Sequence, residues 1–409
     1  MASRKKRQTK PPEVGHVTSA RDRREAHELA VGVFSGFWEG IDRERRSHSE
    51  TPDEMIRICK KGGKIVTHVA LIDKKMRVGS SVVRVCGVGG VSTHPKHRHE
   101  GCALAVMRDA VEFMKHKGYA ASMLFSGAHE LYRKCGYEGA VAEFRAEISV
   151  GQAKKAARDG RLRKARQADI GAMSRLYDRC NRSRTGSMLR PLKDWSSSLK
   201  HGTWLVAEKN GKLVAYGRFN KRWSREGKLR VDESAAENRE AAQSLIAGLG
   251  RRAAEDGFNT LDIMGPPDHA VMRETVMCGG HSTWGRGEYQ MMRVIDLGRL
   301  LGGISEELGA RIGKSELARG KLGMALKTDI GSVRLDIDEG TIAVLDPPKA
   351  KTGATARIPQ KFLMQLVMGY RHVAEVARED GVVIPRALRR PLEALFPVGY
   401  AHVWHVDRF

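Results

Sequence analysis

Near the start of the chain, the spacing of apolar residues predicts a helix followed by two strands. Within Ala20–Trp38, apolar side chains recur every fourth residue, at positions 29, 33 and 37, as they do on one face of a helix. Residues 64–73 and 80–91 are rich in β-branched side chains and partly alternate between apolar and polar, which is typical of strands.

A second helix is predicted directly after a turn-like segment with the sequence THPKHRHEG. Leu104, Met107, Val111 and Met114 are spaced three, four and three residues apart, and Gly118 supplies a stop signal. The first part of the chain therefore reads strand, strand, glycine-containing loop, helix, which is an α/β arrangement.

Similar elements recur in the same order further along the chain. They comprise a small, charged linker at 151–162, a helical stretch near 169–180, a strand pair at 204–219 that turns at Asn210-Gly211, and an acidic-to-helical stretch at 233–256. Asn-Gly between apolar runs is a strong hairpin signal. The repeated order indicates an internal duplication with low sequence similarity.

The last part of the chain begins near residue 297 and has a different pattern. Alternating residues predict strands between 333 and 345, and Pro359 is placed to open a helix. Residues 398–406 alternate again, which predicts a terminal strand that runs almost to Phe409 and holds the end of the chain in place.

Composition narrows the possible partners and the compartment. The net charge is +24, which suits a polyanion such as nucleic acid, anionic lipid or a phosphate-rich cofactor. No motif that reads nucleic acid is present, so nucleic acid is a less favoured partner. The six cysteines have neither CxxC spacing nor paired histidines, which argues against disulfides and zinc and favours a reducing, cytoplasmic compartment. No stretch has the roughly 20 apolar residues of a membrane span.

The loop between the second strand and the second helix is a candidate phosphate site. It contains Arg98, His99, Glu100 and Gly101, and the helix opens with Cys102-Ala103. A helix N-terminus presents free N–H groups that bind phosphate, and a glycine allows the backbone to approach closely. On its own, an ordinary loop with a glycine explains the pattern equally well.

The context of this loop resembles motif A of the GNAT N-acetyltransferase superfamily. The strand ends in Val91-Ser92-Thr93, the loop reads R-x-x-G-x-A, and an amphipathic helix follows. The resemblance implies that these residues, with Arg98–Leu104, bind acetyl-CoA. Ser126–Tyr137 resembles motif B, which adds Ser126 and Gly127 to the cofactor site and makes Tyr132 the general acid. A protonated tyrosine suits that role, although a half-buried core tyrosine is the alternative reading.

Over nearly its whole length the chain resembles the enhanced intracellular survival (Eis) acetyltransferases. The matching stretches include 266–269, 291–294 and 395–397. The resemblance implies a disordered basic tail at 1–14, an acyl-CoA-binding GNAT domain at 15–150, a degenerate GNAT-like domain at 160–296, and an α+β sterol-carrier-like domain at 297–409. It also implies a homo-oligomer, a hexamer by this resemblance, and a base supplied by the terminal carboxylate of Phe409.

Two readings of function remain open. The first is an N-acetyltransferase that moves an acetyl group from acetyl-CoA to an amine by direct attack. The alternative is a non-enzymatic GNAT-fold module that binds a polyanion or lipid, which the charge favours. In either case the second unit is expected to bind no CoA, because Glu233–Asn238 lacks glycine and carries two carboxylates where a phosphate loop should lie. His94, His97 and His99 are interpreted as loop histidines and not as metal ligands.

Overall fold

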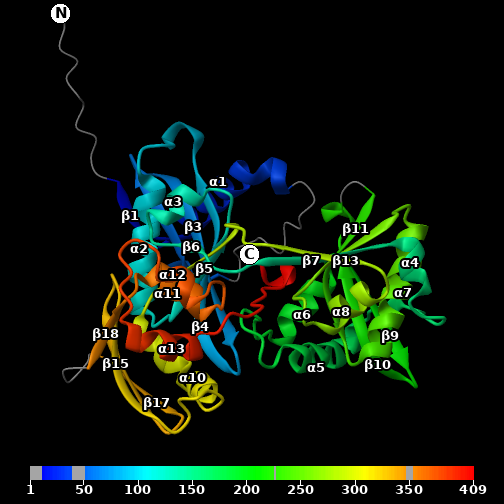
Figure 1. The fold of residues 1–409 in the computed structure, drawn as a ribbon. Coiled ribbons are helices and arrows are strands. Elements are labelled where there is room, and N and C mark those ends of the chain that lie inside the picture. The colour runs from blue at the N-terminus through cyan, green and yellow to red at the C-terminus, as the bar shows by residue number, and fades with distance from the viewer. Residues whose placement is uncertain (1–11, 39–50, 225–226, 347–352) are drawn as a thin grey trace, which may run out of the picture.

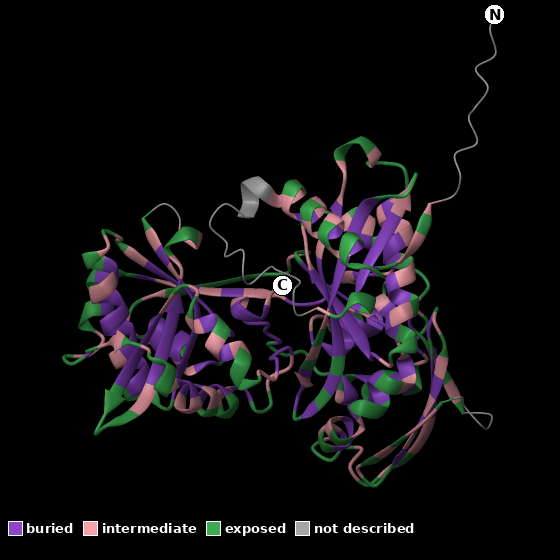
Figure 2. Cartoon of the chain, turned by 180° about the vertical axis from the view of Figure 1, so that it is seen from behind, coloured by how far each residue is buried: buried purple, intermediate pink, exposed green. Residues whose placement is uncertain are grey.

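The computed structural model of the 409-residue chain describes residues 12–38, 51–224, 227–346 and 353–409. These residues form two seven-stranded sheets and one four-stranded sheet, with helices packed on them. The two larger sheets form separate lobes, and the four-stranded sheet lies against the first of them (Figure 1). Buried residues follow the strands, while the outer helix faces are exposed (Figure 2). This mixture of strands and helices confirms the expected α/β class and is consistent with tandem GNAT-like units.

The candidate loop follows strand β4 (Ser81–Thr93) of the first sheet. The strands of this sheet, in spatial order, are β1 (Glu13–His16), β2 (Ile56–Lys61), β3 (Lys64–Val78), β4, β5 (Ala121–Phe125), β14 (Gln290–Val294) and β6 (Glu138–Gly139). β4 and β5 run parallel, because helix α2 (Cys102–His116) crosses over between them. Helices α1 (Ala20–Trp38) and α3 (His129–Arg133) complete this unit, together with short 3-10 turns η3 (Asp53–Met55) and η4 (Pro95–His97).

Helix α2 follows the predicted pattern. Met107, Val111 and Met114 are buried against the sheet, and Leu104 is half-buried. Lys115 and His116 lie in the last turn, where cations favour the negative end of the helix dipole.

The second sheet has the same arrangement of parallel and antiparallel neighbours. Its order is β13 (His281–Gly285), β7 (Glu143–Ser149), β12 (Thr260–Met264), β11 (Lys228–Ala236), β10 (Lys212–Phe219), β9 (Thr203–Lys209) and β8 (Arg163–Lys164). Here the parallel pair is β11–β12. The helical elements of this unit are α4 (Val150–Lys155), α5 (Ile170–Asn181), α6 (Leu192–Leu199), α7 (Arg239–Glu255), α8 (Ala270–Met277), η5 (Gln167–Asp169) and η6 (Lys221–Trp223).

The two units exchange one strand each. β7 continues from the first unit in sequence but pairs with β12 and β13 in the second sheet. β14 comes after the second unit in sequence but pairs with β5 and β6 in the first sheet. The sheets therefore divide the chain differently from the expected ranges 15–150 and 160–296, and the expected linker at 151–162 begins as helix α4.

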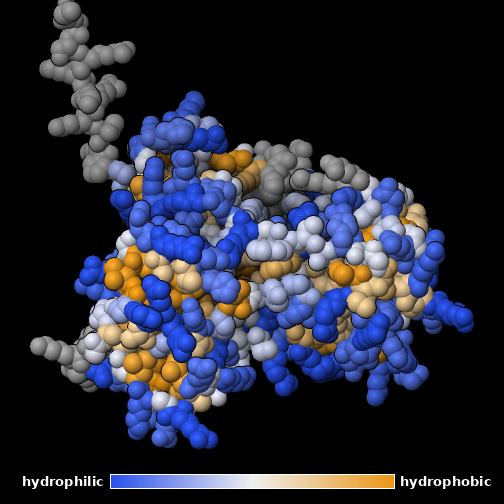
Figure 3. All heavy atoms as spheres, viewed as in Figure 1, coloured by the Kyte–Doolittle hydropathy of each residue, from blue (hydrophilic) through white to orange (hydrophobic). Residues whose placement is uncertain are grey.

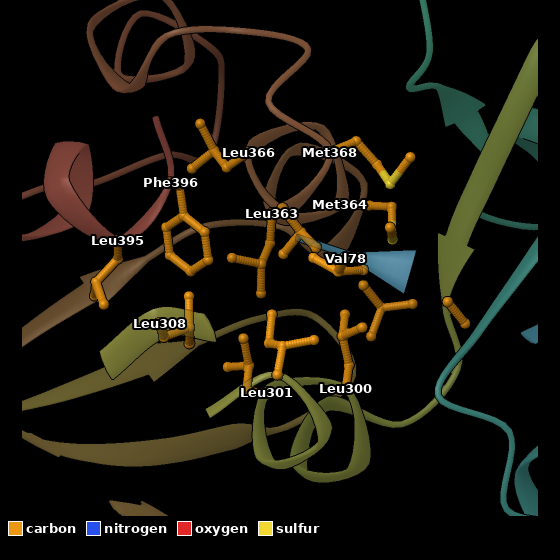
Figure 4. Packing of buried hydrophobic residues seen from close by; sticks show 14 of the residues in the cluster. Val78, Leu300, Leu301, Leu308, Leu363, Met364, Leu366, Met368, Leu395 and Phe396 are labelled. Carbon is orange, nitrogen blue, oxygen red and sulfur yellow. The ribbon is translucent and has the colours of Figure 1, made fainter. Parts of the chain in front are cut away.

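The third unit packs its core onto the first unit. Its sheet has the order β17 (Thr341–Leu345), β16 (Ser332–Asp338), β15 (Lys321–Lys327) and β18 (Ala354–Arg357). Its helices are α9 (Leu297–Gly303), α10 (Ser305–Ile312), α11 (Gln360–Val367), α12 (Val373–Val376) and α13 (Arg386–Leu395). Figure 4 shows Leu300, Leu363 and Phe396 of this unit facing one another and Val78 of β3. The two units therefore share one continuous core, which couples them mechanically.

The predicted terminal strand at 398–406 is wrong. The segment is extended without strand pairing until η7 (His405–Asp407). From residue 401 onward, neighbouring side chains enter the cores of two different units, whereas Val398 and Tyr400 are exposed. Val403 packs in the core shared by the first and third units, and Trp404 packs among the aromatic residues of the second unit. The C-terminus lies in the middle of the molecule, between the lobes (Figure 1).

The structure also tests where the N-terminal tail ends and where the helix after Pro359 begins. Glu13 and Val14 lie in β1, so the disorder expected for 1–14 does not extend to them, while residues 1–11 fall outside the described part of the chain. Pro359 does open a helix, as the N-cap of α11. Hydrophilic side chains cover most of the face seen in Figure 3, in keeping with a composition that is 29% charged.

Candidate functional site

The candidate loop ends at the N-terminus of α2 in a strained, open backbone. Gly101 is the N-cap, with φ of 79°, and His99 also has positive φ, at 62°. A Cβ on Gly101 would meet no atom within 4 Å, so the loop leaves open space beside the first N–H groups of the helix. Arg98 is exposed next to this space. The arrangement suits an anion that approaches the backbone closely.

Glu100 does not present an uncompensated negative charge in this loop. Its carboxylate accepts hydrogen bonds from Lys61 Nζ at 2.6 Å and pairs with His97 Nδ1 at 3.0 Å. Lys61, and after it His97, holds the pKa of Glu100 below its usual value. His97 thus contacts a carboxylate, and His94 Nδ1 accepts from the backbone N–H of Lys96 at 3.3 Å.

The end of β4 carries a bulge, which follows the last residue that pairs with β5. Gly90 has φ of 59°, and the pairing with β3 shifts register between Gly89 and Ser92. Buried His68 holds the bulge through Nδ1, which lies 2.9 Å from the Gly90 carbonyl oxygen. Burial lowers the pKa of His68 to about 4, so the ring is neutral at neutral pH.

Beyond the bulge, no strand among the described residues pairs with the β5 side of β4. Its parallel pairing with β5 ends at Val88↔Leu124, while the strand continues through Val91, Ser92 and Thr93. Within the described residues, the buried hydroxyl of Ser92 has no hydrogen-bond partner. An orphaned polar group and an unpaired backbone edge fit an extended ligand that carries amides, as the pantetheine arm of CoA does.

Tyr132 is buried on the short helix α3, just after the end of β5. Burial raises the pKa of Tyr132, and a hydrogen bond with Ser126 opposes that rise. Its phenol is therefore protonated throughout the neutral range. Ser126 itself is fixed by a backbone hydrogen bond from its N–H to the Tyr289 carbonyl oxygen at 3.0 Å, and neighbouring Gly127 is exposed.

Phe409 lies on β4, at the point where β4 and β5 diverge. A Cβ on Gly89 would lie 3.4 Å from the Phe409 carboxyl carbon, and a Cβ on Gly87 would overlap the Phe409 ring. The ring also meets the Phe125 ring edge-on, with centroids 5.2 Å apart. The two glycines, two residues apart on one strand face, thus form the seat of the terminal residue.

Most of the residues singled out in the sequence gather around β4. The set 91–93 and 98–104 follows one strand into one helix, and Tyr132 and Phe409 both border the end of β5 through Ser126 and Phe125. Sequence reasoning missed Gly87 and Gly89. Their spacing of two within a strand was the usable signal, since a glycine inside a strand often marks a close approach.

In the second unit, the segment expected to replace a phosphate loop is a strand. Glu233–Ala236 ends β11, and only Glu237 and Asn238 separate it from α7, where the Asn238 side chain caps Ala241 N–H at 2.9 Å. Glu233 is fully buried and receives two hydrogen bonds from Arg190, at 2.7 and 2.8 Å. Its carboxylate therefore faces an arginine inside the protein and not a solvent-filled loop.

Comparison with known proteins assigns the class of the first unit. Residues 16–140 match an acetyltransferase (GNAT) domain, so the chain carries a GNAT acetyltransferase domain. No curated protein matches the chain in sequence.

Solved structures resemble the chain over almost its full length. A GCN5-related N-acetyltransferase from Kribbella flavida is 19% identical, with 97% of this chain and 99% of that chain covered and a TM-score of 0.74. One from Anabaena variabilis is 15% identical (97% and 100% covered, TM-score 0.76). Eis1 from Mycobacterium abscessus is also 15% identical (97% and 100% covered, TM-score 0.67). At such identities the likeness concerns the fold, which extends over all three units.

Two further features bear on partners. Among the described residues, no helix is long and apolar enough to cross a membrane. In the same part of the chain, no three His, Cys, Asp or Glu side chains gather as a metal site requires.

Proposed function

We propose that the chain is an N-acetyltransferase that uses acetyl-CoA as cosubstrate and an amine as acceptor. The GNAT domain and the fold of N-acetyltransferases support an acyltransferase in general. One observation carries the specific proposal: the Phe409 carboxyl group lies on β4 beside the end of β5, where Tyr132 also lies.

In the first unit, the backbone of β4 and the loop before α2 bind different parts of acetyl-CoA. The free edge of Val91–Thr93 binds the amide-bearing arm of acetyl-CoA, with help from the Ser92 hydroxyl, and the N-terminus of α2 binds the pyrophosphate. Arg98 contributes a guanidinium fork at the loop. Residues 99–104, Ser126 and Gly127 line the same path. Acetyl-CoA supplies the activated acetyl thioester.

Two groups of the protein transfer protons during the reaction. The acceptor nitrogen attacks the thioester carbon, a C–N bond forms and the C–S bond breaks. The Phe409 carboxylate accepts the proton that the amine loses, and Tyr132 donates its phenolic proton to the departing sulfur. The raised pKa of Tyr132 keeps that proton available.

The proposal extends to the whole assembly in three respects. The second unit binds no CoA, the third unit is related to sterol-carrier proteins, and the chain works as a homo-oligomer in the cytoplasm, with a hexamer expected from the resemblance to Eis proteins. The shared core of the first and third units supports a fixed arrangement of these two units.

Calorimetric titration of the 409-residue chain with acetyl-CoA tests the proposal. We expect one site per chain, lost in Gly101→Glu because a side chain and a negative charge enter the loop. Gly257→Glu is the matched control: Gly257 has the same φ of 79° and an equally open Cβ, but follows α7 in the second unit. A panel of amines, with free thiol release as the readout, then identifies the acceptor.

Two results would contradict this proposal. If the folded chain binds no acetyl-CoA, the proposal fails, and binding of nucleic acid or anionic vesicles in the same titration would favour the non-enzymatic module. If Gly257→Glu loses binding as Gly101→Glu does, the loop of α2 is not the site.

A further inference from the structure

The second unit has its own diverging parallel strands, and the C-terminal segment lies there. Pairing of β11 with β12 ends at Val231↔Ile263, as pairing of β4 with β5 ends at Val88↔Leu124. Next to this point, Trp404 lies within 3.5 Å of a Cβ placed on Gly265, directly after β12. On the other side, His405 Nδ1 is 4.0 Å from Asp232 Oδ2 on β11. Trp404 and His405 therefore bridge the end of β12 and the continuing part of β11.

A buried ionic network fastens this segment. The Arg190 side chain, 3% exposed, donates to both oxygens of Asp407 at 2.7 Å as well as to Glu233. Tyr216 donates its hydroxyl proton to Glu233 at 2.9 Å, and the Arg190 guanidinium stacks on the Tyr177 ring at 4.2 Å. A planar guanidinium held by two carboxylates and a ring has little freedom to move.

Apolar contacts hold the same segment from the other side. Trp404 is fully buried and donates from Nε1 to Asn181 Oδ1 at 3.0 Å. Val406 packs in the aromatic cluster that includes Trp195 and Tyr216. Residues 404–407 are thus anchored in the second unit, and two residues later Phe409 reaches β4 of the first unit.

We propose that Arg190 and Asp407 are positioning residues, which fix the C-terminal segment in the diverging strands of the second unit so that the Phe409 carboxylate is held at the diverging strands of the first. This inference rests on the proposed function for its catalytic consequence. It assigns the degenerate unit a role: its strand opening holds the peptide that completes the other unit's site.

Asp407→Asn is the variant of choice because it preserves folding. The substitution keeps the shape of the side chain and leaves the Arg190–Glu233 pair balanced in charge. Removing Arg190 would instead leave two buried carboxylates unpaired, which is strongly destabilising. Asp169→Asn is the matched control, since Asp169 pairs with both terminal nitrogens of a different arginine of the same unit, Arg163, at 2.7 and 2.9 Å.

The first readout is the division between kcat and KM. Asp407→Asn should lower kcat about tenfold and leave the KM for acetyl-CoA within about twofold, because the cosubstrate contacts are untouched. When one glycine is added after Phe409, the same substitution should have no further effect, as a double-mutant cycle requires if Asp407 acts through the carboxylate. Unchanged kcat in Asp407→Asn, or an equal loss in Asp169→Asn, would overturn the inference.

The second readout needs no activity. A carboxypeptidase that removes C-terminal aromatic residues should release phenylalanine from Asp407→Asn at least tenfold faster than from the wild-type chain or Asp169→Asn. Faster release in a chain that acetylates no amine would support the anchor while the proposed function fails. Equal release rates in all three proteins would show that Asp407 does not hold the segment, whatever the activity.

Discussion

The openings between the parallel strands of the two units have the same topology and opposite contents. After its last pair with β5, β4 continues with Gly89 and Gly90, and the Phe409 carboxyl carbon lies 3.4 Å from a Cβ placed on Gly89. After its last pair with β12, β11 continues with Asp232 and Glu233, which are both buried against arginines, Arg218 and Arg190. Glycine lets Phe409 approach the β4 backbone closely, whereas at the end of β11 the paired carboxylates and arginines take up the space.

The buried ion pairs at the end of β11 serve to fix the place of the C-terminal segment more than to stabilise the fold. Desolvating an ion pair costs about as much as the pairing returns, so buried pairs are weak contributors to stability. They do require a specific arrangement, because any shift leaves a charge unpaired inside the protein. Burial raises the pKa of Glu233, which shows how unfavourable the site would be for its charge without Arg190. The network therefore specifies where Asp407 must lie.

The largest effect is expected from the tyrosine of the first opening. Tyr132→Phe should lower kcat by roughly 10²–10⁴-fold, the usual contribution of a general acid, and leave acetyl-CoA affinity unchanged. Because burial raises the pKa of Tyr132, the alkaline loss of kcat should occur at a higher pH than the titration of an ordinary tyrosine. Steady-state kinetics as a function of pH checks both expectations.

Tyr137→Phe is the control for this prediction. Tyr137 is also buried and donates its hydroxyl proton to Ser122 Oγ at 2.8 Å. Losing that bond should cost about 1 kcal/mol of stability and leave kcat near the wild-type value. If Tyr137→Phe slows turnover as much as Tyr132→Phe, the loss reflects packing and Tyr132 is not the acid.

The second prediction displaces the carboxylate without changing any side chain. One glycine added after Phe409 moves the charged group by a full residue and should lower kcat about 10²-fold, as misplaced reactive groups do. The same glycine added after Met1 should have no effect on turnover. A fully active C-terminal extension would remove the carboxylate from the mechanism.

The third prediction tests the glycine seat of the first opening. In Gly87→Ala the new methyl group would overlap the Phe409 ring, so the ring must move off β4. We expect kcat to fall about tenfold, a loss of about 1.4 kcal/mol in transition-state stabilisation. Gly15→Ala, whose Cβ would meet nothing within 4 Å, should behave like the wild-type chain. Wild-type turnover in Gly87→Ala would mean that the seat does not position the carboxylate.

Local patterns predicted the elements of the first opening but not the contents of the second. The periodicity of Leu104–Met114 specified α2, because a helix face is a property of neighbouring residues. The choice of strand partners is not local, and for this reason the exchange of β7 and β14 could not be foreseen. Arg190 and Asp407 are 217 residues apart, and no sequence pattern links two such charges. Alternation at 398–406 predicted a strand, because alternation records only that opposite faces are buried and not what buries them.

The last prediction concerns stability and not turnover, through a buried histidine in each region. His68 supports the bulge of β4, and His269 packs its ring against Trp404, with centroids 5.6 Å apart. Burial lowers the pKa of His68 to about 4 and that of His269 to about 3. Below an unfolded pKa of about 6.5 the unfolded chain therefore binds protons that the folded chain refuses. The contribution of each histidine is fully present above that pH and is lost as the pH falls toward the folded pKa.

At pH 5 each of these histidines should cost about 2 kcal/mol of unfolding free energy relative to pH 7, since each pKa unit corresponds to about 1.36 kcal/mol. His68→Gln and His269→Gln should therefore each flatten the pH dependence by about this amount, measured by denaturant unfolding at the two pH values. Equal flattening in both variants would mean that His68, beside β4, and His269, beside Trp404, resist protonation alike. Flattening in His269→Gln alone would mean that the fold is most sensitive to acid where it holds the C-terminal segment. On lowering the pH, carboxypeptidase should then release phenylalanine before the first unit unfolds.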